Sequence, residues 1–298
     1  MGQPSAPASP LDRARLPEVS TTLGRLWLRW RSPIRLALSV IGGIVIVLLL
    51  ANPDAHGIDA RGYWAFDPAN PYAEAIGNLN AETAFRYGPP IALAFLPFHA
   101  LSWTAFITIW TLLLVGALLF MGRSWALACA AIYPVAMELS AGNVNLAIAL
   151  AAVVGLRYPA TWSFLLLTKV TPGVGLVWFA VRKEWRNLAI ALGATAALSL
   201  VSWLIAPQMW GQWFEALRSM VGIEPYGAHL PIPLPIRVVA MAVLVAWGAR
   251  SDRPWTLVVA VTLAMPTVFP ASLSALVGLL AVNRFAGRRT QPAGEPAA

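Results

Sequence analysis

The first residue whose type and setting suggest chemistry is Asp59. It lies in the segment His-Gly-Ile-Asp-Ala-Arg-Gly-Tyr-Trp, shortly after the first long apolar run. A carboxylate at a membrane surface can act as a general base toward an acceptor hydroxyl. The alternative is a solvated loop acid, because residues 52–88 contain five of the thirteen acidic residues in the chain.

The second candidate is Lys169, in the middle of an apolar segment that reads Leu-Thr-Lys-Val-Thr-Pro. A lysine inside a membrane costs about 2.5–3.5 kcal/mol on insertion scales, so such a residue is a candidate for function. A cation there would meet an anionic headgroup or a phosphate. The alternative is a lysine that snorkels from a short helix or pairs with Glu138.

A third group of polar residues lies between two apolar segments, in Glu-Leu-Ser-Ala-Gly-Asn-Val-Asn. It contains Glu138, Asn143 and Asn145. Asparagines at the start of a helix often act only as caps, and amides also hydrogen-bond between membrane helices. The pattern therefore favours a structural role, with the lining of a headgroup cleft as the alternative.

The composition places these residues in a membrane protein. The chain has 298 residues, of which 58% are hydrophobic and 11% charged, whereas soluble domains carry about 25% charged residues. This excludes a cytosolic enzyme, a nucleic-acid-binding module and a disordered protein. The net charge of +8 does not indicate a nucleic-acid partner, because the basic residues flank apolar runs in the positive-inside pattern. Membrane lipids are the partners that this pattern predicts.

The elements that must position these residues are apolar helices. We predict a disordered cytoplasmic tail over residues 1–22, a basic interfacial helix over 23–33, a polytopic domain over 34–285 and a second cytoplasmic tail over 286–298. The apolar runs predict about ten membrane segments. They cover roughly 34–51, 89–100, 102–121, 124–138, 143–157, 160–181, 187–206, 235–249, 255–268 and 270–284.

The predicted orientation places both termini inside and the loops 52–88 and 207–233 outside. Arg123 and Arg157 would then lie outside, against the positive-inside pattern. Fusing 89–121 into one bent span and splitting 160–181 into a hairpin moves both residues inside, and the sequence leaves the two topologies open.

No cofactor or metal site is predicted. Cys129 is the single cysteine, and the three histidines are far apart with no ligand spacing. The chain also has no Walker loop, no GxGxxG motif and no Ser/His/Asp arrangement, which makes a nucleotide-driven pump unexpected.

The order of several motifs resembles glycosyltransferase family 87, whose members are polytopic enzymes of the GT-C fold. An acidic residue and aromatics follow the first span. Phe-Arg-Tyr-Gly-Pro-Pro (85–90), Gly-Asn-Val-Asn (142–145), Lys-Val-Thr-Pro (169–172) and Arg-Lys-Glu-Trp-Arg (182–186) come next. The resemblance covers roughly residues 34–285. The chain departs from the family pattern at Asn143, where Gln is usual, and in its shorter C-terminal part.

This resemblance implies a GT-C-like bundle that transfers a sugar, typically mannose, from a polyprenyl phosphate on the outer face of the bacterial plasma membrane. The acceptor would be a hydroxyl of a cell-envelope glycolipid or glycan. Asp59 falls on the catalytic aspartate of the family, which would deprotonate the acceptor for an inverting attack. The residues implied in binding the donor and its phosphate are Lys169, Arg61, Arg86, Tyr87, Asn145 and Tyr63.

Two other functions are compatible with the sequence. A transporter or flippase for a lipid or small solute would place pathway residues such as Lys169 near the middle of the membrane. A family member without catalytic activity would act as a membrane partner protein, as the short C-terminal part allows.

Overall fold

The computed structural model describes residues 22–76, 78, 81, 83–220, 230 and 232–286, with side chains from residue 31 onward. Every regular element in this part of the chain is helical, which confirms the all-α prediction. The predicted tails, residues 1–22 and 286–298, fall almost entirely outside it. The α-helices are α1 Thr22–Ala51, α2 Ile58–Trp64, α3 Pro89–Phe95, α4 Trp103–Gly122, α5 Ala126–Ala130, α6 Tyr133–Ala141, α7 Asn145–Val154, α8 Trp162–Thr168, α9 Val177–Val181, α10 Trp185–Ile205, α11 Pro207–Ser219, α12 Leu234–Arg250 and α13 Trp255–Leu263.

Short 3₁₀ helices connect or extend these elements, often where a proline starts a turn. They are η2 Pro53–Ala55, η3 Leu96–Ala100, η4 Arg123–Trp125, η5 Pro159–Thr161, η6 Thr171–Leu176, η7 Pro270–Leu280 and η8 Val282–Arg284. Many of the apolar runs in the sequence thus fold as pairs of short helices separated by a turn.

The prediction of about ten membrane spans is not confirmed. Judged by length and composition, three stretches of the described chain can cross a membrane, and they are Arg31–Ala51, Trp103–Ala130 and Trp185–Ile205. A fourth span results if α6 and α7, which meet at an angle of 107°, count as one broken span. Other apolar runs form helices that are too short to cross alone.

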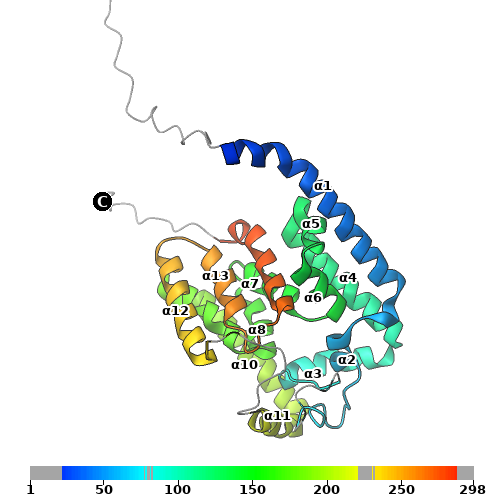
Figure 1. Cartoon of the computed structure of the whole chain (residues 1–298). Helices are drawn as coiled ribbons and strands as arrows, with labels where there is room; N and C mark the ends of the chain where they lie inside the picture. The colour runs from blue at the N-terminus through cyan, green and yellow to red at the C-terminus, as the bar shows by residue number, and fades with distance from the viewer. Residues whose placement is uncertain are drawn as a thin grey trace, which may run out of the picture.

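Helix α1 lies along one side of the molecule, with α5 packed beside its middle and α2 near its C-terminal end (Figure 1). Of the apolar window in its span, only 11% is buried, which is typical of a helix that faces lipid. The predicted interfacial helix 23–33 is continuous with this span in the structure. Its position at a membrane surface stays a prediction.

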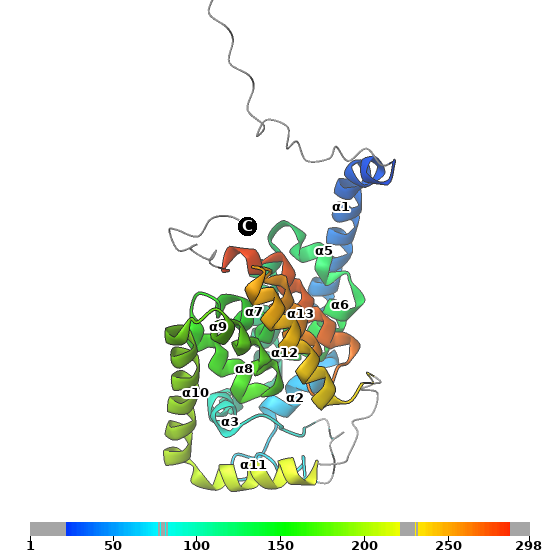
Figure 2. The same ribbon diagram turned by 90° about the vertical axis from the view of Figure 1, so that its left-hand side faces the viewer.

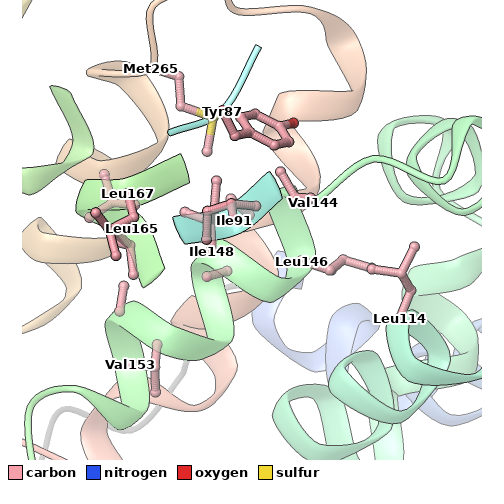
Figure 3. Packing of buried hydrophobic residues seen from close by; sticks show 14 of the residues in the cluster. Tyr87, Ile91, Leu114, Val144, Leu146, Ile148, Val153, Leu165, Leu167 and Met265 are labelled. Atoms are coloured by element: carbon pink, nitrogen blue, oxygen red, sulfur yellow. The ribbon is translucent and has the colours of Figure 1, made fainter. Parts of the chain in front are cut away.

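The centre of the bundle is α7, an almost wholly apolar helix. Leu146 of α7 points toward Leu114 of α4, and Ile148 lies near Ile91 of α3 (Figure 3). All four side chains are buried. This core fixes the start of α7, where the polar residues of the third group are found.

At the opposite edge from α1, the long helix α10 is followed at once by α11, which runs across its end (Figure 2). The amide of Gln212 in α11 donates a hydrogen bond to the carbonyl of Ala69 at 3.2 Å. The two predicted outer loops therefore contact one another on the side of the molecule that carries α2 and α3.

Candidate active site

Helix α2 presents Asp59 to the break between α6 and α7. The helix follows Gly57, which has a positive φ of 91° and whose N–H donates to the carbonyl of Ser140 at 2.7 Å. Asp59 is half-buried, and its Oδ2 accepts a hydrogen bond from Nδ2 of Asn143 at 2.6 Å. One carboxylate oxygen is thus held by an amide, while the half-exposed side chain remains accessible.

The break that supplies Asn143 is a turn over residues 142–145, which we call the Gly142 turn. Gly142 ends α6 in the left-handed conformation, with φ at 69°. A Cβ at this position would lie 2.8 Å from the Cβ of Ala60 and 3.5 Å from the Cα of Gly57. Only glycine permits both the conformation and the close approach, so this residue lets α2 reach the turn.

The Gly142 turn also holds Lys169. Asn145, the first residue of α7, accepts a hydrogen bond from Lys169 Nζ at its Oδ1, and it donates from Nδ2 to Glu138 Oε2, both at 2.8 Å. The other Glu138 oxygen accepts from the N–H of Leu146 at 3.1 Å. Glu138 and Asn145 are almost completely buried, at 0% and 1% exposure. The pairing of Lys169 with Glu138, which was the alternative to a functional lysine, thus runs through the amide of Asn145.

The segment before α3 brings Tyr87 to the same place. The N–H of Gly88 donates to the carbonyl of Leu167 at 2.9 Å, two residues before Lys169. The hydroxyl of Tyr87 lies 3.0 Å from that of Tyr63, which is one helical turn after Asp59 in α2. Both tyrosines are buried, their rings lie 5.5 Å apart between centroids, and both are near enough to Asp59 to be influenced by its charge.

The two tyrosines stay neutral at ordinary pH. Burial raises the pKa of Tyr63 and of Tyr87 well above the usual phenol value, and the negative charge of Asp59 raises both further. Their hydroxyls thus provide hydrogen bonds and not charge. The ionisable groups of the site are Asp59, Glu138 and Lys169, and Arg86 is close enough to act electrostatically on Lys169.

The two arginines predicted for the donor phosphate occupy different surroundings. Arg86 is exposed and donates to the carbonyl of Ala81 at 3.4 Å. The guanidinium of Arg61 lies over the ring of Trp103, 4.4 Å from its centroid. The structure therefore brings Asp59, Asn145 and Lys169 together, with the Tyr63–Tyr87 pair close to Asp59. It places Arg61 against an aromatic ring.

Asn143 belongs to the polar group for which the sequence pattern favoured a structural role, and it was not predicted as a site residue, because an asparagine at the start of a helix also fits a simple capping role. The sequence feature that could have identified Asn143 is the pair of asparagines, two residues apart, that follows Gly142. Among the residues the structure describes, no group of three or more His, Cys, Asp or Glu side chains is arranged to hold a metal ion.

The fold is an apolar helical bundle typical of a polytopic membrane protein. Its polar site consists of a half-buried carboxylate, a buried amide and a lysine, which meet at the break between α6 and α7. The chain belongs to glycosyltransferase family 87, whose family model matches residues 85–294. It is accordingly a membrane glycosyltransferase. The match includes Tyr87, Asn145 and Lys169 but begins after Asp59. No curated protein and no solved structure matches the chain.

Proposed function

We propose that this glycosyltransferase transfers a hexose from a polyprenyl-phosphate sugar to a hydroxyl of a cell-envelope glycolipid or glycan, and that the hexose is mannose. The observation that supports this most directly is the Gly142 turn. It hydrogen-bonds a carboxylate, Asp59, through Asn143, and a cation, Lys169, through Asn145. Sugar transfer from a lipid phosphate needs a base for the acceptor and a positive charge for the leaving group.

In the proposed reaction, Asp59 takes the proton of the acceptor hydroxyl. The acceptor oxygen then attacks the anomeric carbon from the face opposite the phosphate, so the configuration inverts. The bond from that carbon to the phosphate oxygen breaks, and polyprenyl phosphate leaves with the electron pair. Lys169 stabilises the charge that develops on it.

The surrounding residues have supporting roles in this proposal. Asn143 orients Asp59, while Asn145 and Glu138 hold the ammonium of Lys169 in place. Tyr63 and Tyr87 support α2 through their paired hydroxyls, and Arg86 adds positive charge near the phosphate. The apolar helices around the site offer the polyprenyl chain a surface, consistent with a site on the outer face of the bacterial plasma membrane.

The test is a transfer assay with the purified full-length protein, radiolabelled polyprenyl-phosphate mannose and membrane glycolipids. Asp59→Asn is expected to lower the rate about 10²–10⁴-fold, the range for loss of a general base. The matched control is Asp67→Asn, an exposed acid of the same loop that accepts from the N–H of Ala69. The control should transfer sugar at the wild-type rate.

The assignment fails if Asp59→Asn transfers sugar at the wild-type rate, or if both variants lose activity together. Melting temperature and membrane yield, measured on the same preparations, separate loss of chemistry from loss of folding. Comparing the anomeric configuration of donor and product tests inversion. A wild-type protein that moves lipid across liposomes without forming a product would instead support a flippase.

A further inference from the structure

A second polar feature lies far from the candidate active site, at the other end of the span in α1. Arg31, Ser32 and Arg35 of α1 line an open pocket of about 240 Å³ together with Trp125 of η4. Since the span covers 21 residues from Arg31 to Ala51, the pocket is about 30 Å from the end that leads to Asp59. No step of the proposed transfer reaction uses this pocket.

The pocket is positively charged, and none of its arginines pairs with an acidic residue in the part of the chain that the structure describes. Arg31 is exposed, Arg35 is half-buried, and Arg123 is exposed two residues before Trp125. Both ion pairs in the described part of the chain are made by Arg182, so none of these three arginines has one there. Grouped guanidinium groups without a carboxylate are suited to a phosphate, which they bind with paired hydrogen bonds.

The walls of the pocket are held in fixed positions. The guanidinium of Arg35 lies over the ring of Trp125, 5.6 Å from its centroid. Helices α1 and α5 meet at Gly42, where an added Cβ would lie within 3.0 Å of Ala130 Cβ and closer still to the carbonyl of Leu127. This backbone contact fixes α1 against the segment that carries Trp125.

An apolar surface leads away from the pocket along the same helix. Leu36, Val40 and Ile44 recur every four residues on α1, and all three are more than half exposed. On α5, Leu127 is also exposed. A ligand with a phosphate at one end and acyl chains at the other matches this order of charged and apolar surface.

We infer that the pocket of Arg31, Ser32, Arg35 and Trp125 binds the phosphate of an anionic membrane phospholipid, with its acyl chains along the exposed stripe of α1. A volume of 240 Å³ is ample for a phosphodiester group, because one water occupies about 30 Å³. Basic pockets beside membrane helices are a known setting for anionic headgroups. In the predicted orientation, this lipid belongs to the inner leaflet.

The experiment is native mass spectrometry of the full-length protein in detergent, titrated with phosphatidylglycerol, phosphatidylcholine or inorganic phosphate. Wild type is expected to retain phosphatidylglycerol and to release phosphatidylcholine. The double variant Arg31→Gln/Arg35→Gln should bind phosphatidylglycerol about 25-fold more weakly, because each arginine near a headgroup contributes about fivefold. The matched control, Arg186→Gln/Arg250→Gln, removes two exposed charges elsewhere and should bind as wild type does.

Any one of three results overturns the proposal. Equal loss of binding in the two double variants would show diffuse attraction to net charge and not a pocket. Inorganic phosphate that binds as tightly as the phospholipid would show a simple anion site to which the acyl chains contribute nothing. If the double variant does not fold, the single change Arg31→Gln at an exposed position should weaken binding about fivefold, and a change below twofold would also refute the inference. None of these measurements depends on sugar transfer.

Discussion

The hydrogen bond from Asn143 to Asp59 gives the sharpest prediction about catalysis. Asn143→Ala removes an amide that donates to the carboxylate at 2.6 Å. Hydrogen bonds to charged groups contribute about 1.5–3 kcal/mol, and about 1.4 kcal/mol corresponds to a tenfold change in rate. If the amide serves to orient the base, the loss of this bond should lower kcat about 10–100-fold and leave the KM for the donor nearly unchanged.

The assay is sugar transfer from radiolabelled polyprenyl-phosphate mannose, with kcat and KM measured separately. Asn187→Ala is the matched control, because Asn187 Nδ2 donates to Glu184 Oε2 at 2.9 Å, a bond of the same type in a different part of the chain. Asn143→Gln keeps an amide that can donate to Asp59, so this variant should keep most of the activity. A rate for Asn143→Ala within twofold of wild type, or an equal loss in Asn187→Ala, would refute the orienting role.

Three further changes test other features. Lys169→Met should lower kcat about 10²–10³-fold in the same assay, the range for loss of one group that stabilises transition-state charge; activity close to wild type would remove Lys169 from the mechanism. Gly42→Ala should lower the melting temperature, because the added Cβ would overlap the carbonyl of Leu127. At the neighbouring Gly43 an added Cβ has no atom within 4 Å, so Gly43→Ala should raise the melting temperature slightly. Equal shifts in the two variants would contradict the packing of α1 against α5. Burial lowers the pKa of His56 below its usual 6.5, so the contribution of neutral His56 to stability is present above pH 6.5 and is lost as the pH falls through the lowered pKa. His56→Gln should therefore make the melting temperature fall less steeply on the acid side of its pH profile. An unchanged profile would contradict this.

The sequence allowed a site residue to be predicted where it was an isolated polar residue in an apolar run or directly after one. Lys169 stood out because a charge inside an apolar run is costly, and Asp59 because it follows the first span. Asn143 could not be separated from a helix cap, since both roles place an amide at the same position in the sequence. Its partner is 84 residues away, and only the folded chain brings the two together.

The helical class followed from composition, but the helix boundaries did not. The run 124–138 reads as one continuous apolar segment, yet it contains the end of η4, all of α5 and the first part of α6. Breaks of this kind depend on how neighbouring helices accept the freed backbone groups, and the periodicity of one run carries no information on that. The same limit explains why apolar runs outnumber the helices that are long enough to cross a membrane.

The Gly142 turn also constrains how this protein can change over evolutionary time. Asn143 and Asn145 reach their separate partners from positions two residues apart in one short turn. A point substitution alters one of these contacts and leaves the other in place. A single-residue insertion or deletion would instead rotate the start of α7 by about 100° and displace both contacts together. We therefore expect the length of this turn to tolerate less variation than the identity of either asparagine.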